Sequence, residues 1–191
     1  MPTSEPSDEW SPAFRRAYWV VVGIGVFTVL ACGVRAVLTG WVPVGDNAFL
    51  ALRAHDVFSH HPPLLSTASS GGATSGVPYN HPGAAALWLI APFVAVAGSA
   101  GAALGAAVVN AACLAGVGWL AARASRPVFA AGVMASMLGV CSAMGVQALA
   151  DPWNPNQATL VFALLLVAAC ATWCEVPAAV PVGAGAAVVV A

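Results

Sequence analysis

The chain has 191 residues, of which 60% are hydrophobic and only 7% are charged, and its formal net charge at pH 7 is −1. Because soluble domains carry about 25% charged residues, a soluble domain of this size could not cover its surface with so few ionic groups. The near-neutral charge gives no reason to expect a nucleic acid as partner. The composition therefore predicts an all-α fold, a polytopic bundle of transmembrane helices in a lipid bilayer.

The polar N-terminal segment, residues 1–14, is predicted to be a disordered tail. An apolar run at about 17–39 follows Arg15 and Arg16, and it exceeds the roughly 20 residues that a bilayer core requires. Because arginines precede this run and none follows it immediately, the positive-inside rule places the N-terminus in the cytoplasm. We therefore expect a multi-pass protein of the plasma membrane with a cytoplasmic tail.

The stretch 40–100 is predicted to be a long extracytoplasmic loop that carries two juxtamembrane helices, at about 47–58 and 84–98. The apolar residues of the first helix are spread around it and form no clean stripe, which suits a helix between the bilayer surface and the protein. The second helix has about 15 residues and contains Pro92, so it is short for a span. We expect it to lie at the outer surface.

The placement of later arginines supports this topology. If 84–98 crossed the membrane, Arg123 and Arg126 would lie outside, against the positive-inside rule. A polar turn that begins with Asp151 then shares the outer side with the long loop. The remaining spans are expected at about 101–122, 128–150 and 157–174, with a truncated span at 176–191. Small residues dominate the first of them, which favours close packing between helices.

Asp46 is the strongest candidate for a catalytic residue, because it follows the outer end of the first span and precedes a predicted helix. In one interpretation its carboxylate caps that helix by accepting a backbone N–H. In the other it is a general base, since a carboxylate partly withdrawn from water accepts a proton more readily. The two interpretations are compatible, because a cap would also fix the side chain.

Arg53 and Arg35 are the candidates for binding the phosphate of a lipid donor, since a guanidinium suits that group. Arg53 could instead pair with Asp56, three residues further along the same helix. Arg35 lies near the outer end of the first span and could instead extend to the membrane interface.

Three histidines of the outer loop, His60, His61 and His81, lie beside prolines in two rigid turns. Their spacing with the nearby acid matches no standard zinc pattern, so no metal site is predicted. They are candidates for substrate hydrogen bonding, or they are polar aromatic residues placed at the membrane interface. Asp151 begins the second outer turn, two residues before Trp153. It either caps the next helix beside an interfacial tryptophan or forms a polar wall of the cavity that Asp46 faces.

This layout resembles the N-terminal half of the GT-C superfamily of integral membrane glycosyltransferases. That superfamily includes protein O-mannosyltransferases, lipid A aminoarabinose transferases, and actinobacterial arabinosyl- and mannosyltransferases. The features that carry the resemblance are Asp46 shortly after the first span, the proline turns at 60–63 and 81–83, and Asp151 before a proline. The resemblance covers roughly residues 15–175.

The resemblance implies transfer of a sugar from a polyprenyl-phosphate donor to a glycan, lipid or protein acceptor outside the cell membrane. Asp46 matches the acid that acts as general base on the acceptor hydroxyl, and no cofactor is implied with certainty. Many members carry a second acid where this chain has Asn47, which leaves a divalent metal unsupported. The family has more spans than this chain, so we expect a truncated N-terminal part that is inactive alone.

The alternative is a protein without covalent chemistry, either a transporter or flippase subunit or a membrane scaffold. Ionisable residues in the middle of spans would favour a transporter, and the apolar runs hold essentially none. A sugar-transfer assay with a polyprenyl-linked donor separates the transferase from both alternatives.

Overall fold

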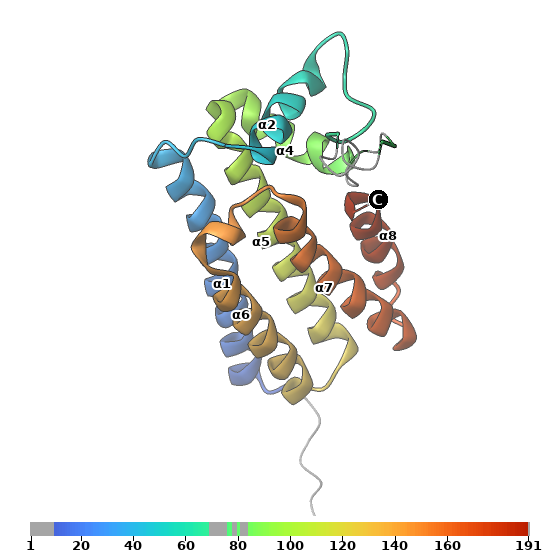
Figure 1. Ribbon diagram of the computed structural model, residues 1–191. Coiled ribbons are helices and arrows are strands. Elements are labelled where there is room, and N and C mark those ends of the chain that lie inside the picture. The colour runs from blue at the N-terminus through green and yellow to red at the C-terminus, as the bar shows by residue number, and fades with distance from the viewer. Residues whose placement is uncertain (1–9, 69–75, 78–79, 81–83, 191) are drawn as a thin grey trace, which may run out of the picture.

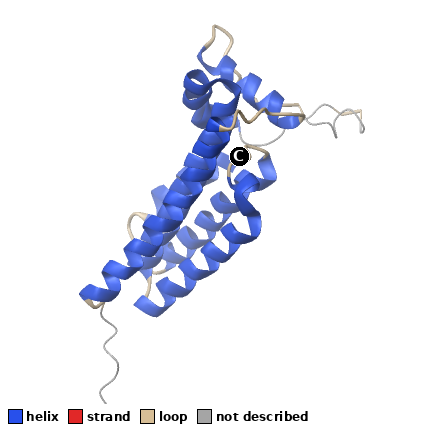
Figure 2. Ribbon diagram, turned by 90° about the vertical axis from the view of Figure 1, so that its left-hand side faces the viewer, coloured by secondary structure: helices blue, strands red, loops and turns tan. Residues whose placement is uncertain are grey.

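The structure, a computed structural model, describes residues 10–68, 76–77, 80 and 84–190. Within these residues the chain is built from helices, and the all-α prediction is confirmed (Figures 1 and 2). The helices in chain order are α1 (Pro12–Leu38), α2 (Asp46–His55), η1 (Asp56–Phe58), α4 (Ala84–Ala97), η2 (Gly98–Ala100), α5 (Gly101–Ala124), α6 (Pro127–Leu149), α7 (Asn154–Trp173) and α8 (Ala179–Val190).

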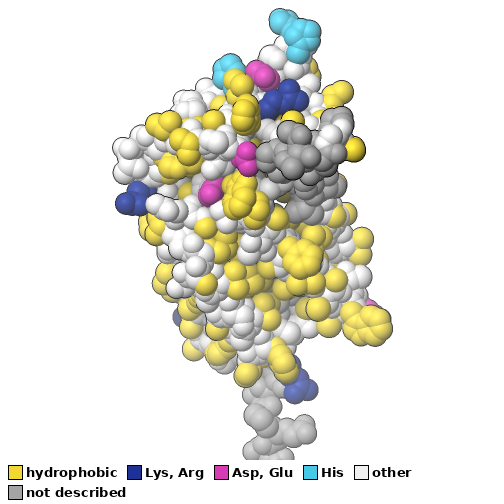
Figure 3. Space-filling model, in the orientation of Figure 1, with side chains coloured by type: hydrophobic (Ala, Val, Ile, Leu, Met, Phe, Trp, Pro, Cys, Tyr) yellow, Lys and Arg dark blue, Asp and Glu magenta, His cyan; other side chains and the backbone are white. Residues whose placement is uncertain are grey.

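The described helices include four stretches long and apolar enough to cross a membrane, which are Pro12–Leu38, Ala84–Ala124, Pro127–Leu149 and Asn154–Trp173. The long helices run side by side, and α2 and α4 lie at one end of the bundle (Figure 1). On the face drawn in Figure 3, hydrophobic side chains cover the middle, while acidic and histidine side chains gather mainly at that end. This is the architecture of a multi-pass membrane protein.

Helix α5 is the centre of the bundle and packs against α1, α4, α6 and α7. Small residues permit these contacts. A Cβ at Gly33 of α1 would lie 2.6 Å from the Cβ of Ala107, and a Cβ at Gly118 would lie 3.0 Å from Val22. The backbones of α1 and α5 therefore approach more closely than larger side chains would allow.

The stretch Ala84–Ala124 is not one straight helix, because Gly98 adopts φ +63° between α4 and α5. Helix α4 folds back onto the first turns of α5. A Cβ at Gly101 would collide with the carbonyl oxygen of Phe93, and one at Gly105 would lie 2.9 Å from Ile90. With 14 residues α4 is too short to span a bilayer, whereas the 24 residues of α5 are sufficient.

Two expectations were wrong: the residue at which the first helix begins, and the lack of an apolar stripe on the helix after it. Helix α1 begins at Pro12 rather than near residue 17, because Ser11 caps it by accepting a hydrogen bond from the N–H of Phe14 at 3.2 Å. The part of the predicted tail before residue 10 lies outside the described residues. Helix α2 with η1 does have an apolar stripe, which packs against α4 and consists of Leu50, Ala51, Ala54 and Val57.

Helix α6 contains a kink at Gly145, whose φ of 73° and ψ of 172° are not helical. Beyond the kink, the carbonyl oxygen of Leu149 accepts a hydrogen bond of 3.0 Å from Nδ2 of Asn110, a fully buried residue of α5. The last turn of α6 is therefore set apart from the rest of the helix and held by α5.

Candidate functional site

The two polar segments that the sequence assigned to one side of the membrane meet at one end of the bundle. Nδ2 of Asn47, in the first turn of α2, donates a hydrogen bond of 2.7 Å to Oδ1 of Asp151, which lies between α6 and α7. These residues are 104 positions apart in the chain. The contact joins the long loop to the Asp-Pro turn.

Asp151 is held by three hydrogen-bond donors. Besides the amide of Asn47, the backbone N–H of Trp153 donates to Oδ1 at 3.0 Å and Nδ2 of Asn156 donates to Oδ2 at 2.9 Å. The contact with Trp153 is an Asx turn, which starts the chain into α7. Asp151 thus organises the turn before α7, although its side chain is not the N-cap of that helix, because Trp153 occupies the N-cap position.

A cavity of about 350 Å³, called here the polar pocket, lies where the end of α1, the α1–α2 linker and the end of α6 meet. The polar side chains that line it come from Arg35, Thr39, Asn47, Gln147 and Asp151. Of the two arginines that the sequence proposed for phosphate binding, only Arg35 lines this pocket.

The chemistry of the polar pocket combines one cation, one carboxylate and two carboxamides. Among the described residues, the guanidinium of Arg35 has no hydrogen-bond or ion-pair partner. Oδ1 of Asn47 is buried and has no partner there either. The carboxylate of Asp151 is already engaged by its three donors. The pocket therefore offers a free cation, which suits a ligand with a phosphate group.

Asp46 lies beside the polar pocket and does not line it. It is the first residue of α2, whose N-cap is Gly45 with no side-chain cap, so the predicted capping by Asp46 is wrong. Its side chain is exposed, and a very small cavity, about 10 Å³, separates it from Trp153 and Asn154. Its sequence neighbour Asn47 does line the pocket. Asp46 is thus open to water, one residue before the lining of the polar pocket.

Arg53 has a different role from the expected one. Its Nη2 donates a hydrogen bond of 3.2 Å to the carbonyl oxygen of Leu65, and it does not line the polar pocket. The expected pair between Arg53 and Asp56 is not formed, because Asp56 lies 3.9 Å from Nδ1 of His55 instead. Both members of that pair are exposed, so it contributes little to stability.

The histidines assigned to substrate binding are not brought to the pocket in the described part of the chain. His60 and His61 lie on the exposed turn after η1, where the N–H of His61 donates to Oγ of Ser59 at 3.1 Å. His81 lies outside the described residues. Among the residues that the structure describes, no three His, Cys, Asp or Glu side chains gather closely enough to hold a metal ion.

Sequence reasoning missed the carboxamides. Asn47 was considered only as the residue that replaces a second acid, yet its amide links the two polar segments. Gln147 lines the polar pocket from the last turns of α6. Asn110 and Gln157 are buried within apolar helices. A carboxamide inside an apolar run is a usable signal, since burying one without a partner is costly.

Comparisons with protein-family models, with curated proteins and with solved structures find no match to this chain. The functional argument therefore depends on the geometry of the pocket and its neighbours.

Proposed function

We propose that the protein is a membrane glycosyltransferase that moves a sugar from a polyprenyl-phosphate donor to an acceptor hydroxyl at the outer face of the plasma membrane. The observation that supports this is the convergence of Arg35, Asn47, Gln147 and Asp151 on one polar pocket, with the exposed Asp46 directly before Asn47 in the chain. In this proposal the pocket end of the bundle is extracytoplasmic. The opposite end carries the N-terminal arginines of α1 and the α5–α6 turn, and it faces the cytoplasm (Figure 1).

The residues divide the chemistry between them. Arg35 binds the donor phosphate through the planar guanidinium. Sugar hydroxyls donate to the remaining lone pairs of Asp151, which lines the polar pocket. Asp151, fixed by three donors, positions the wall of the pocket. Asp46 is exposed and accepts no hydrogen bond within the described structure, so it is free to take a proton from the acceptor.

In the transfer step the acceptor hydroxyl gives its proton to Asp46, and its oxygen attacks the anomeric carbon of the donor sugar. The bond between that carbon and the phosphate oxygen breaks, and the lipid phosphate leaves with the electron pair. Arg35 stabilises the charge that develops on the leaving phosphate. The step balances without a nucleotide, because the donor already carries its leaving group.

The test compares sugar transfer in membranes that contain a full-length version of the protein or its variants, with a radiolabelled polyprenyl-phosphate sugar as donor. Asp46→Asn keeps the shape of the side chain and removes the base, so transfer should fall about 100-fold or more. Asp56→Asn is the matched control, because Asp56 is also acidic, lies in the next short helix and does not line the pocket. Undiminished transfer by Asp46→Asn would remove Asp46 from the mechanism.

A second pair of variants tests the phosphate site. Arg35→Ala removes the cation of the polar pocket, and loss of a charged hydrogen bond worth about 1.5–3 kcal/mol should raise the KM for the donor roughly tenfold or more. Arg53→Ala is the control, since Arg53 contacts Leu65 outside the pocket. A larger effect from Arg53→Ala than from Arg35→Ala would place the phosphate elsewhere. Donor binding by the unaltered protein without any transfer would favour the flippase alternative.

A further inference from the structure

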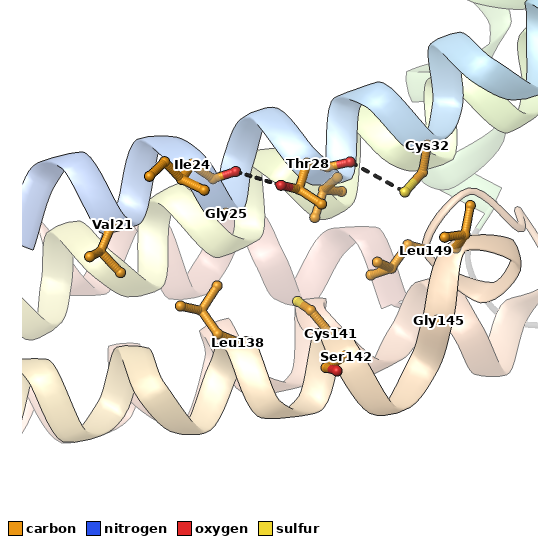
Figure 4. A pocket seen from close by; sticks show the side chains of 12 residues that line it. Val21, Ile24, Gly25, Thr28, Cys32, Leu138, Cys141, Ser142, Gly145 and Leu149 are labelled. Carbon is orange, nitrogen blue, oxygen red and sulfur yellow. Dashed lines mark hydrogen bonds between the residues drawn. The ribbon is translucent and has the colours of Figure 1, made fainter.

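A second cavity lies directly against the polar pocket, on the membrane-spanning side. This cavity, called here the lateral groove, has a volume of about 450 Å³ and runs between α1 and α6 (Figure 4). Cys32 and Val146 line both cavities, so the groove and the polar pocket adjoin. The remaining lining is mostly apolar, with Ile24 and Leu138 on opposite walls.

Two polar side chains in the groove, those of Thr28 and Cys32, form hydrogen bonds within their own helix, and most of the other lining residues are apolar. Oγ1 of Thr28 donates to the carbonyl oxygen of Ile24 at 2.8 Å, and Sγ of Cys32 donates to the carbonyl oxygen of Thr28 at 3.2 Å (Figure 4). The groove is also open to its surroundings, since Ile24 is 61% exposed and Val146 is 48% exposed. Within a bilayer, hydrocarbon rather than water surrounds such an opening.

We propose that the lateral groove holds the isoprenoid chain of the lipid donor while the phosphate of the same molecule binds Arg35 in the polar pocket. This inference rests on the proposed function. Charge complementarity supports an anionic head group, because Arg35 is the one cation among the residues that line the pocket and has no partner in the described part of the chain. A polyprenyl phosphate has a single chain, and the lateral groove is one apolar channel that adjoins the pocket of Arg35.

The arrangement defines how the donor reaches the site. The lipid slides in from the outer leaflet between α1 and α6, with its chain staying in hydrocarbon and its phosphate at the level of Arg35. The kink at Gly145 lies in the lining of the groove, just before Val146, where groove and pocket join. The acceptor approaches from the opposite, aqueous side, where Asp46 is exposed.

The experiment uses a polyprenyl monophosphate with a diazirine near the phosphate end of its chain, added to the protein in lipid nanodiscs. After illumination, crosslinked peptides are mapped by mass spectrometry, and we expect them to come from α1 and α6. Thr28→Phe places a ring in the groove that competes with the chain for the same volume, so labelling should fall about tenfold. Ser142→Phe fills the groove from α6 and should have the same effect.

Thr159→Phe on α7 is the matched control. Thr159 is exposed like Thr28, its Oγ1 likewise donates to the carbonyl oxygen four residues earlier, at 2.9 Å, and it does not line the groove. Labelling should be unchanged in this variant. Equal labelling of folded Thr28→Phe and Thr159→Phe proteins, or crosslinks on α7 and α8 instead, would overturn the inference.

Two further outcomes are decisive. Diazirine-bearing phosphatidylglycerol that labels the groove as strongly as the polyprenyl phosphate would overturn the assignment of the groove to the donor lipid. Groove labelling in a protein that transfers no sugar would support the lipid site and defeat the proposed function. Sugar transfer with the label on other helices would defeat the lipid site and leave the proposed function standing.

Discussion

At the position of Asp151, one carboxylate joins parts of the chain that are distant in sequence, because it accepts hydrogen bonds from Asn47, Trp153 and Asn156. Asp151→Ala would leave the Asn47 amide and the Trp153 N–H without this acceptor. We expect a loss of about 2–3 kcal/mol in the free energy of unfolding, since part-buried donors lose a charged acceptor. The measurement is the thermal unfolding midpoint of the purified protein in detergent.

Asp56→Ala is the control for this prediction, because the only ion pair of Asp56 in the described structure is the exposed contact with His55 at 3.9 Å. Asp151→Ala should therefore lower the midpoint clearly more than Asp56→Ala. Equal midpoints would show that the three hydrogen bonds of Asp151 do not stabilise the junction of the two polar segments.

The candidate site could be predicted from the sequence only in part, and single residues show why. Asp46, Arg35 and Asp151 stood out as charged groups next to apolar runs, and two of them line the same pocket. The contact between Asn47 and Asp151 could not be predicted, because it depends on how α1, α5 and α6 pack. Arg53 was proposed together with Arg35 for phosphate binding, yet its side chain donates to the Leu65 carbonyl oxygen.

At the scale of elements, the corner between α4 and α5 depends on glycine. Gly101→Ala would place a methyl group against the carbonyl oxygen of Phe93, a backbone atom that cannot move alone. We expect a loss of about 2 kcal/mol or more in stability, because overpacking at a backbone contact forces α4 away from α5. The readout is again the unfolding midpoint in detergent.

Gly139→Ala on α6 is the matched control, since a Cβ there meets nothing within 4 Å. Replacing an exposed helical glycine by alanine should leave stability unchanged or raise it by up to about 1 kcal/mol. Similar midpoints for the two variants would mean that α4 is not packed against α5 as described.

The boundaries of the helices show which sequence signals were underweighted. Hydropathy located the apolar runs, but α7 begins at Asn154, three residues before its apolar run, because Pro155 lies in its first turn and Trp153 provides the N-cap. Proline beside polar residues was taken for a loop when it marks a helix start. The kink at Gly145 had no local signature, since glycines at 132 and 139 of the same helix remain helical.

At the scale of the whole molecule, sidedness decides whether the pocket can exist as one site in a membrane. In a variant whose five native cysteines are replaced, single cysteines report which end of the bundle faces outward. His60→Cys and Trp153→Cys place an exposed thiol in each of the two polar segments, and Ser125→Cys places a half-buried thiol in the α5–α6 turn. We expect a membrane-impermeant maleimide, added to intact cells, to label the first two variants and to label Ser125→Cys only after the membrane is permeabilised.

The expected labelling follows from the structure, because the contact between Asn47 and Asp151 holds both polar segments at one end of the bundle. At the other end, Arg123 and Arg126 flank Ser125. Labelling of His60→Cys and Trp153→Cys from opposite sides would separate Asp46 from Asp151 by the bilayer, and no common site could then form.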